Sequence, residues 1–184
     1  MQSRRKLLSR LVCLCVLTVL PVPRLASQQS AAPDWQDLGF LLGEWKGAGT
    51  GQPGQVAGKF AFKLDLQRHV LVRTNYAEYP ATTERPAFRH DDLMIVYRES
   101  SSGPTKAIYF DSEGHVIHYG VKVNTVAETV TFVSEPAAGG VPNYRLTYIG
   151  KGPDVVSIKF EIAPPDKPDQ FQTYIEASAW RTAK

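Results

Sequence analysis

The chain has 184 residues, with 21 Lys and Arg, 18 Asp and Glu, and a formal net charge of +3. Five of the basic residues and no acidic residue lie in residues 1–27, so the remaining 157 residues carry 16 basic and 18 acidic side chains, a formal charge of −2. No basic run or basic aromatic patch occurs there, so we expect no nucleic-acid partner. Both cysteines, Cys13 and Cys15, also lie in the first segment, which leaves no disulfide, cysteine nucleophile or thiolate metal site for the rest.

The first 27 residues have the pattern of a secretory signal peptide. Residues 1–10 are basic, residues 11–22 are mostly apolar, and the small residues Ala26 and Ser27 follow. A retained membrane anchor is the alternative, but an apolar run of about a dozen residues is too short to span a bilayer. We therefore predict an exported protein, periplasmic or secreted, with no stable membrane insertion after cleavage and with one domain over residues 28–184.

Beyond the signal, the sequence predicts one short helix and many short strands. Residues 34–42 suit a helical plug, and residues 59–64 and 156–162 alternate polar and apolar side chains, which indicates strands with one buried face. Similar runs occur at residues 43–50, 69–77, 91–98, 105–111, 115–123, 129–134, 143–150 and 171–181. The pattern predicts an all-β fold, an antiparallel up-and-down β-barrel of about ten strands with a short N-terminal helical plug. A two-sheet sandwich is the main alternative.

The first predicted strand is rich in glycine. Trp45, Gly47, Gly49 and Gly51 share one face of this strand, which has almost no side chains beyond the tryptophan. Glycine permits sharp coiling of a strand or the close approach of another group. We expect a bend that closes the barrel, with a ligand contact as the alternative.

The segment from Phe40 to Gly51, followed by Pro53, resembles the opening motif of the nitrobindin-like barrels, ten-stranded relatives of the lipocalins and fatty-acid-binding proteins. Residues 77–80, 90–94 and 109–119 resemble uncharacterised secreted bacterial proteins of that calycin type. The resemblance implies a barrel that holds a small ligand. It also implies haem as a ligand, because nitrobindins bind haem through a histidine near the C-terminus. This chain departs from that pattern, since it has no histidine after His118.

Strand order predicts which polar residues lie together. Alternate loops of an antiparallel meander share one end, and loops 51–56, 78–90, 111–115, 135–142 and 163–170 form the longer set, typical of a functional mouth. Eight polar residues gather there: Tyr76, Glu78, His90, Asp91, Asp92, Asp111, Glu113 and His115.

Within this group, His90, Asp92 and His115 are candidate metal ligands or acid–base residues, because imidazole titrates near neutrality and carboxylates orient it. Ordinary turn chemistry explains the same aspartates and the glycine that follows them. His115 and His118 point to opposite faces of a strand, and we expect His115 inward and His118 outward.

Interior polarity is a further sign of a binding site. Arg73 shares a face with Leu71 and Asn75. An outward Arg73 is the commoner arrangement, whereas an inward one needs an acid such as Glu176 or an anionic ligand group. Candidate ligand contacts are Trp45, Arg73, Tyr76, Tyr97, Tyr109 and Tyr119, and Tyr148 is a further tyrosine of this kind.

These observations lead to one functional hypothesis and two alternatives. We expect a monomeric, exported barrel that binds a small hydrophobic or amphipathic molecule, entering at the long-loop end, and that is more a binding protein than an enzyme. The alternatives are an enzyme that uses the His/Asp cluster and a ligandless barrel that binds another protein through its loops. Fold analogy alone supports the ligand.

Overall fold

The computed structural model describes residues 31–51, 56–100, 102–136 and 140–183. The predicted signal peptide, residues 1–27, lies outside the described residues. No helix among the described residues is long and apolar enough to cross a membrane.

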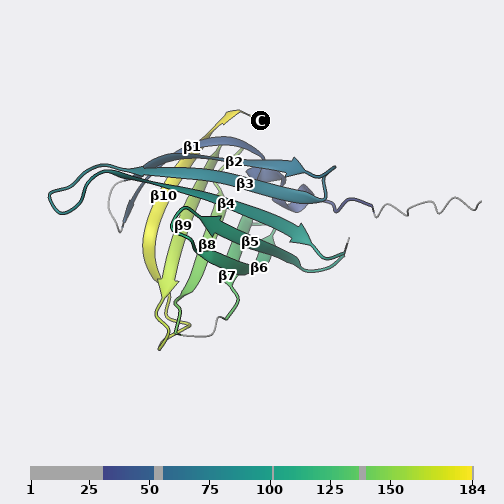
Figure 1. The fold of residues 1–184 in the computed structure, drawn as a ribbon. Helices are drawn as coiled ribbons and strands as arrows, with labels where there is room; N and C mark the ends of the chain where they lie inside the picture. The colour runs from purple at the N-terminus through teal and green to yellow at the C-terminus, as the bar shows by residue number, and fades with distance from the viewer. Residues whose placement is uncertain (1–30, 52–55, 101, 137–139, 184) are drawn as a thin grey trace, which may run out of the picture. The chain divides into compact units, whose positions relative to one another are not determined.

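Ten antiparallel strands close into one barrel, with each strand paired to its neighbours in sequence and β1 paired to β10 (Figure 1). The elements are η1 (Gln36–Leu41), β1 (Gly43–Gly51), β2 (Val56–Asp65), β3 (Val70–Tyr79), β4 (Phe88–Arg98), β5 (Thr105–Asp111), β6 (Val116–Asn124), β7 (Thr129–Ser134), β8 (Asn143–Gly150), β9 (Val155–Ala163) and β10 (Gln172–Ala183). The predicted up-and-down barrel is therefore confirmed, and the sandwich is wrong because the sheet has no free edge.

The plug η1, a 3-10 helix, lies at the end of the barrel that has the short connections. Trp35 beside it donates an indole hydrogen bond to the carbonyl of Arg68 in the β2–β3 turn, and Leu38 and Leu41 are fully buried. Arg181 of β10 donates hydrogen bonds to the carbonyls of Phe40 and Leu42. This end is thus closed by apolar packing and by hydrogen bonds to the plug's backbone.

The hydrophobic core fills the half of the barrel next to the plug. The core residues from the strands include Trp45, Phe62, Leu71, Val96, Val130, Phe132 and Val156. Aromatic rings form its centre, with Phe62 and Phe132 each meeting Tyr148 edge-on at 5.5 and 6.3 Å between ring centroids. Edge-on pairs of this kind add stability beyond the area that they bury.

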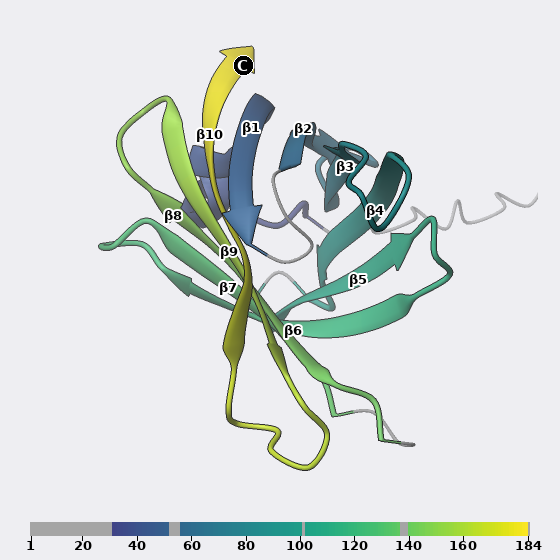
Figure 2. The same cartoon turned by 90° about the vertical axis from the view of Figure 1, so that its left-hand side faces the viewer.

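Strand order predicts which connections lie together at the opposite end, and these connections are the longer ones. The β3–β4 hairpin projects far from the barrel, and the β9–β10 connection forms another extended loop (Figure 1, Figure 2). The β5–β6 turn, the end of β7 at Ser134 and the start of β8 at Asn143 belong to the same end. The functional side chains lie just inside this end.

The glycines of β1 and β2 mark places where neighbouring backbones come very close. A Cβ atom on Gly49 would lie 2.6 Å from the Glu176 carbonyl oxygen of β10, and one on Gly58 would lie 2.2 Å from the Tyr76 carbonyl oxygen of β3. Neither distance is compatible with a side chain. Gly49 thus permits the close approach of β10 to β1, and Gly47 is part of the cavity lining; the bend itself stays a prediction.

We predict that Gly58→Ala lowers the free energy of unfolding by about 2–4 kcal/mol, because the β2–β3 backbone must move to accept the methyl group. Gly120→Ala is the matched control, since a Cβ there meets no atom within 4 Å, and we expect it to change stability by less than about 0.5 kcal/mol. Urea denaturation of both variants measures the difference. Equal stability of the two variants would contradict the close approach at Gly58.

Candidate functional site

The half of the barrel toward the long loops is hollow. It contains a cavity of about 370 Å³, within the range usual for small-molecule sites. Its apolar wall includes Phe60, Ile117, Tyr119, Tyr144, Leu146, Ile158, Phe160 and Ile162. Its polar groups are Arg73, Asn75, His90, Asp92, Tyr109, Asp111, Glu113 and His115.

Arg73 lies inside the barrel, on the boundary between the packed core and the cavity. It is 7% exposed, and its Nη1 donates a hydrogen bond to Asp92 Oδ1 of the adjacent strand β4. The expectation of an outward Arg73 is wrong, and Glu176 is not its partner: Glu176 is exposed on β10. Arg73 faces inward because the side chains of this part of β3 alternate between the two faces of the sheet, and Leu71 and Arg73 lie on the buried face.

Asp92 holds three groups of the site together. Its side chain is 4% exposed, accepts hydrogen bonds from Arg73 Nη1 and from Asn75 Nδ2 (2.7 Å), and places Oδ2 3.6 Å from His90 Nε2. Burial has the largest single effect on the pKa of the Arg73 guanidinium and lowers it, but the Asp92 carboxylate together with Tyr148 and Tyr109 outweighs burial and raises the pKa, so Arg73 stays charged. Asn75 is absent from the candidates that the sequence indicates, although it shares the inward face with Arg73.

Two polar atoms beside this pair are buried without a hydrogen-bond partner in the described part of the chain. They are Arg73 Nε and the hydroxyl oxygen of Tyr148. The Arg73 guanidinium carbon lies about 6 Å from the ring centroids of Phe60 and Tyr148, so aromatic faces surround the charge. Burial raises the pKa of Tyr148 to about 12, so this phenol is neutral.

His90 bridges the rim of the cavity and its interior. Its Nδ1 lies 2.9 Å from Glu113 Oε1, and its Nε2 lies 2.9 Å from the Tyr109 hydroxyl. The Asp92 carboxylate raises the pKa of His90 most, burial lowers it, and the Glu113 carboxylate raises it again, so that His90 titrates at a pKa of about 9. At neutral pH both ring nitrogens therefore carry hydrogens.

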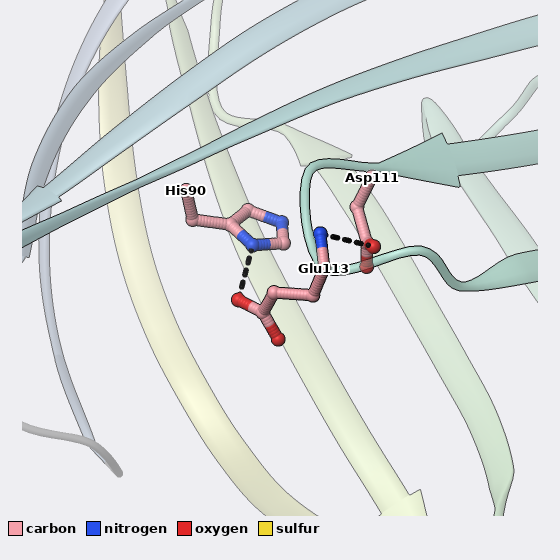
Figure 3. A group of neighbouring side chains, drawn as sticks. All are labelled: His90, Asp111 and Glu113. Carbon is pink, nitrogen blue, oxygen red and sulfur yellow. Dashed lines mark hydrogen bonds and ion pairs between the residues drawn. The ribbon is translucent and has the colours of Figure 1, made fainter.

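The β5–β6 turn fixes the acids of the rim. Asp111 accepts hydrogen bonds from the backbone N–H groups of Glu113 (3.0 Å) and His115 (2.9 Å), and its Oδ2 lies 2.8 Å from His115 Nδ1. Burial raises the pKa of Asp111, but these hydrogen bonds together outweigh burial and lower the pKa below its ordinary value. Figure 3 shows the result: Glu113 reaches from the turn toward the His90 ring, with Asp111 beside it.

The candidate metal ligands are only partly brought together. His90, Asp111 and Glu113 have ligand atoms within 4.8 Å of one another, whereas Asp92 is bonded to Arg73 and Asn75, and His115 is bonded to Asp111. A cation at the first three residues would have to displace the His90 proton and compete with the turn hydrogen bonds of Asp111. The arrangement thus favours a protonated His90, hydrogen-bonded to Glu113 and Tyr109, over a cation bound at these residues.

Of the eight polar residues predicted at the mouth, Glu78 and Asp91 face outward, where they pair with Arg89 at 3.9 and 2.6 Å. His115 is at the cavity rim but is 54% exposed, so the inward expectation holds only in part. His118 is exposed, as expected.

Of the residues predicted as ligand contacts, Trp45 and Tyr97 lie outside the cavity lining and Tyr76 lies only at its edge. Trp45 is a core residue, 1% exposed, whose indole donates to the Leu41 carbonyl (2.8 Å) beside the plug. Tyr97 faces out of the barrel, because its neighbour Val96 takes the fully buried position on β4. Tyr76 is at the cavity edge, but its ring packs under the exposed Arg89 guanidinium at 4.1 Å, on the outer face.

Arg73, Tyr109 and Tyr119 line the cavity, and their contact with a ligand stays a prediction. Tyr119 is 2% exposed and meets Tyr109 edge-on, with 6.4 Å between ring centroids. The sequence candidates omit the opposite wall, where Tyr144 and Phe160 stack at 6.0 Å. The inward alternation of residues 158, 160 and 162 is the signal for this wall in the sequence.

The residues of the cavity do not fit a haem between its walls. Both ring nitrogens of His90 are engaged, by Glu113 and by Tyr109. His115 lies at the exposed rim, so a porphyrin held there would lie at the mouth. Strands β8, β9 and β10 contain no histidine.

Comparisons with known proteins give a fold and no family. No family model and no curated protein matches the chain. Among solved structures, Rv2717c from M. tuberculosis is similar over 82% of this chain and 98% of that one, with a TM-score of 0.55 and 17% identity. Two weaker matches are a de novo designed fluorescence-activating β-barrel (TM-score 0.40, 10% identity, 78% of this chain and 95% of that one) and EF1p2_mFAP2b bound to DFHBI (0.36, 13%, 79% and 97%). The likeness to Rv2717c supports the fold alone, an antiparallel β-barrel.

The His90 network makes stability depend on pH. The pKa of His90 is raised from 6.5 to about 9 in the folded state, so its stabilising contribution is complete below pH 6.5 and is lost as pH rises through 9. We expect a loss of about 1–3 kcal/mol over this interval, reduced from the full shift by solvent at Glu113. Urea titrations from about pH 6 to about pH 10 measure it.

His90→Gln is the matched control, because it keeps a polar side chain without a titrating ring. Its stability should change much less over the same interval. An equal loss in the variant and the original protein would show that other groups cause the effect.

Proposed function

We propose that this protein binds a small apolar or amphipathic molecule in the hollow half of its barrel. The observation that carries the proposal is the division of the interior. A packed aromatic core fills the plug end, and a cavity of about 370 Å³ with buried charged groups at its floor occupies the other. Ligand pockets have this composition, with mostly apolar walls and a small number of polar groups that fix the orientation of the ligand.

The shape of the barrel supports entry at the long-loop end. The plug closes the other end through buried leucines and the Arg181 hydrogen bonds. The stacked rings of Tyr79 and Phe88, 4.5 Å apart at the start of the β3–β4 hairpin, form part of the cavity lining on the open side. A molecule entering there passes the polar rim with Glu113 and His115 and these aromatic rings first, and meets the buried Arg73–Asp92 pair last.

A binding function is better supported than the two alternatives. A metal enzyme at His90 would require displacement of a proton that Asp92 and Glu113 both stabilise. A ligandless barrel acting through its loops would have a filled interior, and this interior is half hollow. The cluster is better suited to orienting a bound molecule.

We predict that N-phenyl-1-naphthylamine, an apolar probe that fluoresces in apolar sites, binds the protein saturably at one site. Ile117→Trp narrows the cavity from β6 and should weaken binding at least about tenfold, since overfilling a packed wall costs about 1–3 kcal/mol. Fluorescence titration gives both dissociation constants.

Ile108→Trp is the matched control, since Ile108 pairs with His118 on the outer face of the same β5–β6 hairpin and is not part of the cavity lining. Binding that Ile117→Trp and Ile108→Trp weaken equally would place the probe outside the cavity.

The proposal includes export, on the basis of the basic, apolar and small-residue pattern of residues 1–27. We predict that protein recovered from outside the cytoplasm has lost about the first 27 residues. Intact-mass measurement of that protein is the test, and a full-length mass in a membrane fraction would contradict cleavage.

A further inference from the structure

His90 holds the Tyr109 hydroxyl in a defined orientation at the cavity wall. The ring bonds Glu113 through Nδ1 and Tyr109 through Nε2, each at 2.9 Å. Since Glu113 offers a carboxylate, Nδ1 carries a hydrogen and donates it. The state of Nε2 then decides whether Tyr109 accepts a hydrogen bond or donates one.

The charged groups around His90 put a hydrogen on Nε2. Asp92 Oδ2 lies 3.6 Å from this nitrogen, and Arg73 and Asn75 hold the Asp92 carboxylate in place from β3. Asp111 and Glu113 approach from β5 and its turn, and both are acids. On the outer side of β4, Arg89 and Asp91 pair with each other.

With a hydrogen on Nε2, the Tyr109 oxygen accepts it and the phenol hydrogen must point elsewhere. No second partner of this hydroxyl occurs among the described residues. Tyr109 belongs to the cavity lining, and burial raises the pKa of its phenol, so the group stays a neutral donor. An unused hydrogen-bond donor on a cavity wall is a polar contact available to a ligand.

The other charged groups of the lining are bonded to one another or to backbone N–H groups. Arg73 pairs with Asp92, His90 pairs with Glu113, and Asp111 is held by His115 and two backbone N–H groups. An anionic ligand would find no unpaired cation in this lining, and a cationic ligand would find the carboxylates of Asp92, Glu113 and Asp111 already bonded to other groups. A buried charge without a partner is costly, so the cavity suits an uncharged molecule.

We propose, resting on the proposed function, that Tyr109 donates the hydrogen bond that orients the ligand, and that the ligand class is an uncharged molecule with an apolar body and a carbonyl-type acceptor. The apolar body lies against the aromatic wall, with Tyr144 and Phe160 on one side and Tyr119 on the other. The acceptor lies at Tyr109, above the Arg73–Asp92 pair.

The test compares three probes that share similar bulk. Prodan, 6-propionyl-2-(dimethylamino)naphthalene, carries a ketone; N-phenyl-1-naphthylamine has no carbonyl; and 6-(dimethylamino)-2-naphthoate replaces the ketone by a carboxylate. Their dissociation constants are measured at neutral pH by fluorescence titration with the original protein, Tyr109→Phe and Tyr97→Phe. Tyr97 is the matched control because its side chain faces out of the barrel.

In Tyr109→Phe we expect prodan binding to weaken about five- to tenfold, the usual effect of losing one hydrogen bond, with a shift of its emission to the blue. N-phenyl-1-naphthylamine binding should change less than about twofold, and Tyr97→Phe should change neither. The naphthoate should bind the original protein at least about tenfold more weakly than prodan.

Raising the pH through about 9 should weaken prodan binding in the same way as Tyr109→Phe, because neutral His90 accepts the phenol hydrogen.

Equal weakening of prodan and N-phenyl-1-naphthylamine in Tyr109→Phe would overturn the inference, since the ring would then act by packing alone. Tighter binding of the naphthoate than of prodan would overturn the choice of an uncharged ligand. Both outcomes leave the proposed binding function intact. Failure of every probe to bind the original protein would instead overturn the proposed function itself.

Discussion

The buried ion pair between Arg73 and Asp92 organises this barrel. The two side chains are 8% and 4% exposed and lie where the aromatic core ends and the cavity begins. Such a pair contributes little net stability, because the cost of removing two charges from water offsets their attraction. Losing one partner, however, leaves an unpaired buried charge. We therefore explain the pair by its effect on neighbouring groups and not by its contribution to stability. Its main effect is that the Asp92 carboxylate raises the pKa of His90.

The pair can exist because the rest of the barrel carries the stability. The plug, its buried leucines and the edge-on aromatic cluster around Tyr148 fill one half densely. Arg98 of β4 donates a hydrogen bond to the Asp37 carboxylate of the plug (2.6 Å), and Arg181 bonds the plug's carbonyls from β10. With this end packed, the long-loop end can stay hollow and hold polar groups that a uniformly filled barrel would exclude.

The barrel is predictable from the sequence because two-residue alternation is a strong local signal. The predicted strands 105–111, 129–134 and 143–150 match the structure residue for residue. The same signal gives the relative faces of residues within a strand but not which face is inside. For this reason the outward orientation expected for Arg73 and the cavity position expected for Tyr97 differ from the structure, because polar or aromatic side chains can lie on either face.

The site itself depends on register between strands, which local patterns do not contain. Asn75 lies opposite Asp92 only because the β3–β4 hairpin connects Tyr79 to Phe88 with the observed length. A slip of one residue would turn Asp92 outward. Strand order is enough to place His90 and Asp111 at one mouth. It does not give the bond of His90 to Tyr109, since side-chain rotamers decide it.

The most direct test of this account is the protonation state of His90 at neutral pH. Nitrogen-15 NMR of the ring-labelled protein at neutral pH distinguishes an imidazolium from either neutral tautomer by the shifts of the two ring nitrogens. The account predicts an imidazolium for His90, which becomes neutral only as the pH approaches its pKa of about 9. A neutral ring at neutral pH with an unprotonated Nε2 would contradict it, because Tyr109 would then donate to His90 and not into the cavity.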